Sequence, residues 1–215
     1  MSPSAWGRPA LLDAAAQLNV PLTDSAADRL LGFLDLLQRW NATYNLTAVR
    51  DPAEMLTQHL VDCLAVIPPL RRSGALRILD VGSGGGLPGV VIAVAMPDAE
   101  VVCVDTVGKK AAFVRQVAVE LKLAHLRGEH ARVESLKVPP FDLVVSRAFA
   151  SLADFVGLTR QHLKPGGVWM AMKGKRPDAE IAALPATVEM FHVEQLEVPG
   201  LSAERCLVWM RPRAA

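Results

Sequence analysis

The sequence predicts an α/β protein in which a seven-stranded, mostly parallel sheet has helices on both faces and a helical extension at the N-terminal end. Beyond residue 77, apolar runs alternate with segments of helical periodicity, as in repeated strand–helix–strand units. The predicted strands are apolar on both faces, which is typical of a parallel sheet buried between two layers of helices. The chain has 215 residues, of which 51% are apolar, and this is enough material for a globular core.

Helical signals fill the first 70 residues. Apolar side chains recur at helical spacing over 30–44, and Thr23 is a candidate N-cap for that helix. A second helix is predicted to begin with Asp51 as its cap and to end at Pro68 and Pro69, since proline cannot continue a helix. We therefore expect residues 1–70 to form a helical cap or extension on the main domain of residues 71–215.

Seven short segments of the main domain have the composition of strands. They are residues 77–81, 100–105, 124–128, 141–146, 167–173, 188–198 and 205–210. Helices are predicted over residues 89–96, 109–121 and 151–163, with a short turn over 131–136. The last two strands are joined by a turn that contains Pro199-Gly200, so we expect them to form an antiparallel hairpin at one edge of the sheet.

Composition and cysteine usage exclude several classes of protein. The formal net charge is +1, which gives no support for a polybasic tail. The three cysteines form no CxxC pair and lack histidines at zinc-finger spacing, so no metal site is expected and a reduced, cytoplasmic compartment is the default. The N-terminal residues do not resemble a signal peptide, and the most apolar run, 87–96, is about half the length needed to span a bilayer.

A glycine-rich loop follows the first predicted strand and leads into a helix. Gly84, Gly86 and Gly89 formally satisfy GxGxxG, the dinucleotide fingerprint. Glycines let the backbone approach a ligand, and ligands of open α/β sheets bind beyond the carboxyl ends of the strands. Asp105 closes the next strand, where an acid can hold ribose hydroxyls of either a dinucleotide or another nucleoside cofactor. The loop therefore predicts a nucleotide-like ligand.

The position of Asp80 distinguishes between the two cofactor classes. It lies two residues before Gly82, the first glycine of the loop, and this register resembles motif I of class I S-adenosylmethionine-dependent methyltransferases. An acid there can help to hold a cationic methionine amino group, directly or through water, whereas it would repel a pyrophosphate. The turn Leu163-Lys164-Pro165-Gly166-Gly167 also resembles one that is common in these enzymes.

A more specific resemblance covers the chain from about Trp40 to Gly174. Six segments occur in the order seen in the RsmG (GidB) family, namely Trp40-Asn41-Ala42-Thr43-Tyr44-Asn45-Leu46-Thr47, His59-Leu60-Val61-Asp62, residues 79–89, Gly108-Lys109-Lys110, Arg132-Val133-Glu134 and residues 146–152. This family comprises bacterial guanine-N7 methyltransferases of 16S ribosomal RNA. Two departures are small, since Cys63 and Thr106 replace the usual serines.

The resemblance implies a class I methyltransferase Rossmann-like fold and S-adenosyl-L-methionine as cofactor. It also implies 16S rRNA, or the small ribosomal subunit, as partner, and an S-adenosylmethionine-binding domain over residues 71–215. Together with the motif interpretation, it gives as cofactor-binding candidates Asp80, Gly82, Gly84, Gly86, Leu87, Asp105, Val133, Glu134 and Arg147. The choice of guanine N7 comes from the resemblance alone.

The reaction that the resemblance implies needs little acid–base chemistry. Guanine N7 has an in-plane lone pair and can attack a sulfonium methyl group without losing a proton, so no general base is expected. Arg147, at the end of the fourth predicted strand, is assigned a positioning role on a phosphate, the base edge or the cofactor carboxylate. Because a paired guanine in A-form RNA hides its N7 edge, the target is expected to be unpaired or extruded.

Several polar residues are candidates for contact with RNA. They are Asn41, Tyr44, Asn45, His59, Lys109, Lys110, Lys173, Lys175 and Arg176. Each has a plainer alternative: the asparagines can cap a helix, and His59 can pair with Asp62 three residues later, which we favour. Residues 147–176 hold six cations against one acid, so the neutral total conceals a local basic segment that could follow phosphates.

Three other functions remain open from the residues alone. A methyltransferase for another RNA, a small molecule or a protein would share the same cofactor loop. An NAD-dependent dehydrogenase would suit GxGxxG and Asp105, but the chain shows no obvious Tyr-x-x-x-Lys pair. A non-catalytic RNA-binding module would leave the glycine loop unexplained. The sequence does not determine the oligomeric state, for which a monomer is favoured.

Overall fold

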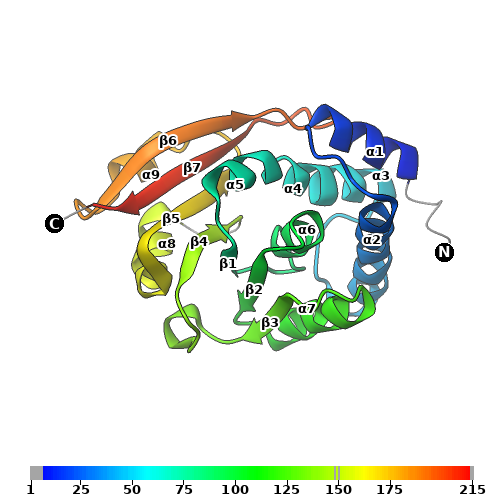
Figure 1. The fold of residues 1–215 in the computed structure, drawn as a ribbon, viewed down its shortest axis with the longest axis horizontal. Coiled ribbons are helices and arrows are strands. Elements are labelled where there is room, and N and C mark those ends of the chain that lie inside the picture. The colour runs from blue at the N-terminus through cyan, green and yellow to red at the C-terminus, as the bar shows by residue number, and fades with distance from the viewer. Residues whose placement is uncertain (1–6, 148, 150, 214–215) are drawn as a thin grey trace.

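The computed structural model describes residues 7–147, 149 and 151–213, and shows helices wrapped around one twisted sheet (Figure 1). Ala148 and Ala150 of the motif over 146–152, and residues 1–6 of the N-terminal segment, lie outside this description. The helices of six or more residues are α1 (Arg8–Gln17), α2 (Asp24–Tyr44), the π-helix η2 (Leu56–Val61), α5 (Ile67–Ser73), α6 (Gly89–Ala95), α7 (Gly108–Glu120) and α8 (Leu152–Thr159). The shorter ones are α3 (Pro52–Met55), α4 (Asp62–Leu64), η3 (Val133–Ser135), η4 (Arg160–His162) and α9 (Asp178–Ala182).

The seven predicted strands form a single sheet. They are β1 (Arg77–Val81), β2 (Glu100–Asp105), β3 (Leu126–His130), β4 (Phe141–Ser146), β5 (Leu163–Lys173), β6 (Val188–Leu196) and β7 (Arg205–Pro212). Their order is β3-β2-β1-β4-β5-β7-β6, with β1 to β5 parallel and β7 antiparallel to both of its neighbours. The strand order reverses between β1 and β4, which is where ligands of such sheets bind. The predicted fold class and the edge hairpin are confirmed.

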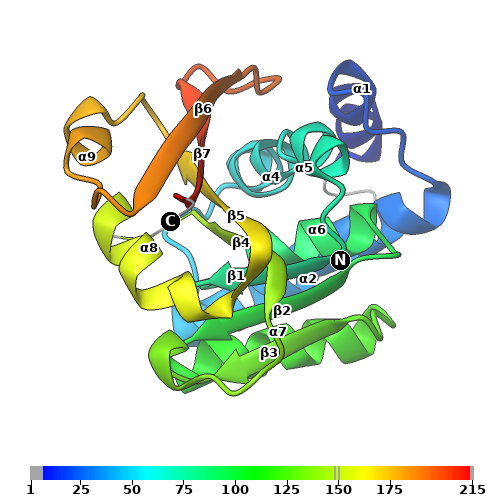
Figure 2. The ribbon, with the colours of Figure 1, turned by 60° about the vertical axis from the view of Figure 1, so that its left-hand side comes forward.

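Each face of the sheet is covered by its own set of helices. Alternate strand residues point to opposite faces, so Ile78 packs with α2, α6 and α7 whereas Leu79 packs with α8. Figure 2 shows α8 and α9 on the side of the sheet away from α6. The N-terminal helices contribute Leu11 and Leu30 to the same apolar core as the sheet. Both faces of the sheet are therefore buried. A ligand can reach the sheet only at its two remaining sides, the edge where the parallel strands begin and the edge where they end.

The segment from Asp51 to Ser73 differs from the single helix that the sequence predicts. Asp51 caps it as expected, but the α-helix gives way after Met55 to the π-helix η2, and α4 ends at Leu64. The prediction that the prolines end the helix was wrong, because Pro68 and Pro69 lie in the first turn of a new helix, α5. Proline is tolerated there because first-turn N–H groups have no partner within the helix.

Other boundaries shift by a few residues. Strand β3 begins two residues later than predicted, β5 begins four residues earlier at Leu163, and the helix predicted over 151–163 ends as α8 at Thr159 before a 3-10 turn. Thr23 accepts a hydrogen bond from the Ala26 N–H group, as its assignment as N-cap requires. Across the described residues, the helices are all too short or too polar to cross a membrane.

Candidate functional site

The glycine loop lies between the carboxyl ends of β1 and β2. Gly82, Gly84 and Gly86 all have positive φ angles, which glycine adopts without strain. A Cβ atom at Gly86 would lie 2.6 Å from Cγ2 of Val90, whereas one at Gly82 would meet no atom within 4 Å. Gly86 therefore allows close packing of the loop on α6, and Gly82 faces open space.

Most amide groups of this loop already have partners within the protein. Gly82 and Ser83 donate to the Val104 carbonyl, and Gly86 and Leu87 donate to the Ser83 carbonyl. The Gly84 N–H group donates to Oδ2 of Asp105 at 3.0 Å. A ligand beside this loop would therefore be held mainly by side chains and by the shape of the site. Fewer backbone amides are free to bind it than the sequence suggests.

Asp80 is fully buried behind the loop. Its Oδ2 accepts the N–H of Gly89, the first residue of α6, at 2.8 Å, and Oδ1 has no partner in the described residues. Burial raises the pKa of Asp80 to about 7, although the Gly89 hydrogen bond and the charge of Arg147 act in the opposite direction. The structure thus gives Asp80 an anchoring role at the start of α6, and its contact with a cofactor stays a prediction.

Asp105 lies at the end of β2 and is also largely buried. Its carboxylate accepts N–H groups from Gly84 and Val107, and the Lys110 ammonium lies 3.9 Å away. Asp105 also lines a cavity of about 530 Å³, which we name the carboxyl-edge crevice. Holding the glycine loop and facing this crevice are compatible, since each carboxylate oxygen can accept more than one hydrogen bond.

The carboxyl-edge crevice brings together five predicted site residues that lie at or after the ends of β1, β2 and β3. Gly82, Asp105, Lys110, Val133 and Glu134 all line it. Its size is typical of a small-molecule site. Five other predicted cofactor residues do not line it, namely Asp80, Gly84, Gly86, Leu87 and Arg147. Leu87 is buried in the core beneath α6, and Gly84 and Gly86 shape the loop behind the crevice wall. A role for these five in cofactor binding stays a prediction.

Arg147 follows β4, and its side chain contacts the π-helix and the start of α4. Its Nη1 donates to the Gln58 carbonyl at 3.2 Å and lies 3.7 Å from the Asp62 carboxylate. Asp62 also accepts a hydrogen bond of 2.8 Å from Nε of Arg205 on β7. The buried carboxylate is thus shared by two arginines that lie far away in the sequence, an arrangement that sequence spacing cannot predict.

A second cavity of about 400 Å³ adjoins these residues, and we name it the Arg147 cavity. It is lined by Gln58, His59, Asp62, Arg147, Met172, Lys173, Gly174 and Arg205. The prediction that His59 pairs with Asp62 was wrong: Nε2 of His59 instead lies 2.9 Å from the Thr47 hydroxyl. The π-helix is the local reason, because its wider turn changes which residues share a face. Of the RNA candidates, His59 and Lys173 line this cavity.

The candidates at the end of α2 divide into structural and exposed residues. Asn41 is buried, and its Oδ1 accepts the Thr47 N–H group. Asn45 has a positive φ angle and ends the helix, as the capping alternative requires, and its side chain accepts from Arg50. Tyr44 packs its ring against Trp40. Because 40% of the residue is still exposed, it can also contact another molecule.

The basic candidates differ in how far their charges are neutralised. Lys173 and Arg176 form ion pairs with Glu180 and Asp178, respectively. Among the residues described, the exposed Lys109 and Lys175 have no ion-pair partner. These two lysines belong to loops or helix ends that follow β2 and β5, on the same side of the sheet as the crevice.

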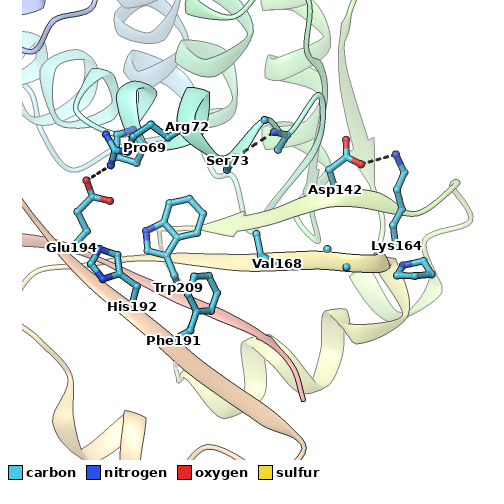
Figure 3. A pocket seen from close by; sticks show the side chains of 15 residues that line it. Pro69, Arg72, Ser73, Asp142, Lys164, Val168, Phe191, His192, Glu194 and Trp209 are labelled. Carbon is cyan, nitrogen blue, oxygen red and sulfur yellow. Dashed lines mark hydrogen bonds and ion pairs between the residues drawn. The ribbon is translucent and has the colours of Figure 1, made fainter. Parts of the chain in front are cut away.

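A third cavity, of about 520 Å³, lies at the opposite edge, where β4 and β5 begin, and we name it the amino-edge cavity (Figure 3). Its cations are paired, Arg72 with Glu194 and Lys164 with Asp142 (Figure 3). The indole of Trp209 also lines it, and its Nε1 has no hydrogen-bond partner in the described part of the chain. Sequence reasoning did not predict this cavity.

The cysteines and acids show no sign of metal chemistry in the described residues. No group of three or more His, Cys, Asp or Glu side chains there is arranged to hold an ion. All three cysteines are buried and unpaired, as the sequence suggested. Burial raises the pKa of Cys63 to about 12, so its thiol is not a nucleophile at neutral pH.

Comparison with known families and sequences gives one consistent match. The family model described as rRNA small subunit methyltransferase G matches residues 26–208. A relative of that name from Leptothrix cholodnii is 63% identical over 210 residues, which is 96% of each chain. A second, from Methylibium petroleiphilum, is 62% identical over 199 residues and covers 91% of this chain and 90% of its own.

Solved structures share the fold at low sequence identity. TrmN from Thermus thermophilus superposes with a TM-score of 0.56 and 21% identity, over 74% of this chain and 53% of its own. An O-methyltransferase from Bacillus cereus, solved in complex with SAH, gives a TM-score of 0.57 and 19% identity over 98% of this chain and all of its own. At this identity the likeness establishes the methyltransferase fold.

Proposed function

The chain belongs to the rRNA small subunit methyltransferase G family, and on that premise we propose that it methylates N7 of a guanine in 16S ribosomal RNA. The methyl donor is S-adenosyl-L-methionine, and the enzyme is a methyltransferase of the small-subunit rRNA. The observation that carries the proposal is the crevice at the carboxyl ends of β1 to β3, which is lined by predicted cofactor residues that end or follow these three strands.

The residues present fit this cofactor. Gly82 leaves open space at the crevice wall, Asp105 offers a carboxylate to ribose hydroxyls, and Val133 and Glu134 border the same crevice further along the sheet. When bound, S-adenosylmethionine supplies a methyl group on a cationic sulfonium. Asp105 has a second role here, because its bonds to Gly84 and Val107 hold the loop in shape before any ligand arrives.

Arg147 would position the reactants, and no side chain needs to accept a proton. The charge moves from the sulfonium to the guanine during transfer, so additional fixed cations at the methyl group would be unfavourable. Arg147 already donates to Gln58 and lies beside Asp62, which partly neutralises and orients its guanidinium group. Its task is then to fix a phosphate, the base edge or the cofactor carboxylate.

The partner is small-subunit rRNA, free or within the subunit, and the cell compartment is the cytoplasm. Lys109 and Lys175 follow β2 and β5 at the carboxyl ends of the strands, and their charges have no ion-pair partner in the described chain, so they could contact phosphates. Tyr44 offers an exposed ring for stacking. The target guanine is unpaired or extruded, because its N7 edge must reach the methyl group. Alternatives are another RNA, a small molecule or a protein as methyl acceptor.

Two measurements test the proposal. Chemical mapping of N7-methylguanine in 16S rRNA, from cells with and without the gene, should show one modification that disappears with the gene; an unchanged map would refute the substrate. Thermal unfolding with added ligand should show stabilisation by S-adenosylmethionine. Stabilisation by NAD alone would exclude the cofactor assignment.

A further inference from the structure

One wall of the carboxyl-edge crevice is built from η3, the short 3-10 turn that follows β3. Val133 and Glu134 of this turn line the crevice. The N–H groups of Ser135 and Leu136 donate to the carbonyls of Arg132 and Val133, inside the same segment. These bonds close the turn but do not attach it to the sheet, so the position of the wall depends on its contacts with other elements.

Two consecutive carbonyl groups of η3 accept hydrogen bonds from two consecutive side chains of η4. Nε2 of His162 lies 2.7 Å from the Val133 carbonyl, and Nε2 of Gln161 donates to the Glu134 carbonyl at 2.9 Å. A carbonyl oxygen can only accept, so Nε2 of His162 carries the proton of its bond. The Leu136 N–H group, at 3.1 Å, uses the second lone pair of the Val133 carbonyl, which fixes the orientation of that peptide group.

The two contacts from η4 differ in burial. His162 is 3% exposed, whereas Gln161 is an exposed residue. Water does not compete for a hydrogen bond in the interior, so His162 makes the stronger contact. An imidazole is costly to bury, and the bond mainly offsets this cost, so it adds little net stability. Its main effect is to give the Val133 peptide group a fixed direction.

The segment that carries His162 is itself anchored in the core. The indole Nε1 of Trp169 on β5 donates to the Thr159 hydroxyl at 2.8 Å, and both side chains are fully buried. Thr159 is the last residue of α8 and directly precedes η4. Contacts from Trp169 through Thr159 and His162 to Val133 therefore connect the crevice wall to the centre of the sheet.

We propose that His162 is a positioning residue for the methyl donor: its bond to the Val133 carbonyl holds the η3 wall of the crevice in the shape that binds S-adenosylmethionine. This inference rests on the proposed function, which supplies the cofactor. His162 lies behind Val133 and does not line the crevice itself. We therefore expect it to act on the affinity for the cofactor and not on the transfer of the methyl group.

A second histidine provides a matched control. Nε2 of His125 lies 2.8 Å from the Ala93 carbonyl of α6, which is the same kind of bond, and neither residue lines the crevice. His162→Leu and His125→Leu each remove one such bond, whereas His162→Gln keeps an N–H donor at the end of the side chain. Isothermal titration of the full chain gives Kd for S-adenosylmethionine, methyl transfer to 16S rRNA gives kcat and KM, and urea unfolding gives the stability of each variant.

We expect His162→Leu to raise Kd and KM for S-adenosylmethionine about tenfold, the effect of one lost hydrogen bond, and to keep kcat at saturating cofactor within about twofold. His162→Gln should restore most of the affinity. His125→Leu should lose stability but bind the cofactor as the parent chain does. An unchanged Kd in His162→Leu, or an equal loss of affinity in His125→Leu, would overturn the inference.

Failure of the proposed function would give a different result. An unaltered chain that does not bind S-adenosylmethionine would refute the cofactor assignment and this inference with it. An unaltered chain that binds the cofactor but makes no N7-methylguanine would refute only the substrate, because the titrations of the His162 and His125 variants need no RNA.

Discussion

The two edges of the sheet carry cavities of nearly equal volume but of different chemistry. The carboxyl-edge crevice measures about 530 Å³ and the amino-edge cavity about 520 Å³. Strands end at the first and begin at the second, so the carboxyl edge receives the glycine loop and Asp105, whereas the amino edge receives the turn over residues 163–167. Volume therefore does not distinguish the two cavities, whereas the predicted cofactor residues do, because Gly82, Asp105, Val133 and Glu134 line only the carboxyl-edge crevice.

Two aspartates show the difference most directly. Burial raises the pKa of Asp80 at the carboxyl edge, where one of its oxygens has no partner among the described residues. At the amino edge, burial alone would also raise the pKa of Asp142, but hydrogen bonds from Lys164 and from the Arg77 and Leu76 amides lower it. The amino edge thus compensates the buried charge of Asp142, whereas the carboxyl edge, where we propose that the cofactor binds, leaves one oxygen of Asp80 without a partner in the described residues.

The largest predicted effect is the pH dependence caused by Asp80. Its folded-state pKa of about 7 lies above its value in the unfolded chain, so its stability contribution is complete below about pH 4 and is lost as the pH rises to 7. The loss amounts to at most about 4 kcal/mol. Asp80→Asn keeps an oxygen for Gly89 and should abolish this loss, as measured by urea unfolding between pH 5 and pH 8.

Asp142→Asn is the matched control and should act with the opposite sign. The pKa of Asp142 is lowered by its partners, so its contribution is present at neutral pH and lost in acid. The variant should therefore be destabilised at pH 8 and approach the parent chain in acid. Parallel pH profiles for both variants would contradict the contrast between the two edges.

Next in size is the loss of turnover on removing Arg147. Arg147→Ala should lower kcat by about 100-fold, the cost of a misplaced reactant, while the protein stays folded. Lys164→Ala removes a half-exposed cation at the amino edge and should leave methyl transfer within twofold. Methyl-transfer assays on 16S rRNA compare the two. Full activity in Arg147→Ala would remove this residue from the site.

A pair of glycines separates backbone strain from ligand binding. Gly82 and Gly166 both have positive φ angles, and a Cβ atom added to either would meet open space, so alanine at either should cost about 1–2 kcal/mol of stability. Only Gly82→Ala adds an atom in the crevice, and it should weaken binding of S-adenosylmethionine about tenfold. Isothermal titration measures the affinity of each variant for S-adenosylmethionine, and urea unfolding measures its stability. Equal affinity in both variants would place the cofactor elsewhere.

The smallest effect is predicted for single lysines at the carboxyl edge. Lys175→Ala removes a charge that has no ion-pair partner in the described chain. A plot of the logarithm of rRNA affinity against the logarithm of salt concentration should then have a slope that is smaller in magnitude by about one. Arg72→Ala, which removes a cation already paired with Glu194, should leave the slope unchanged. Filter binding at several salt concentrations measures both. Identical slopes would contradict the assignment of the RNA-binding face.

The sequence alone determined the parts of this protein that depend on local physics. Seven apolar segments predicted seven strands, Thr23 and Asp51 predicted two helix caps, and the run from Asp80 to Gly89 predicted a glycine loop that leads into a helix. These features depend on side-chain periodicity and on backbone freedom within a few neighbouring residues, so they are visible in any short window of the sequence.

The tertiary structure alone decided which polar groups meet. Asp62 pairs with Arg147 and Arg205 and not with His59, and His59 bonds Thr47, because a π-helix and the strand order bring those residues together. Asp80 lies behind the loop and not in the crevice, because the start of α6 uses its carboxylate. Contacts between distant residues depend on how the elements pack, and no local pattern records that packing.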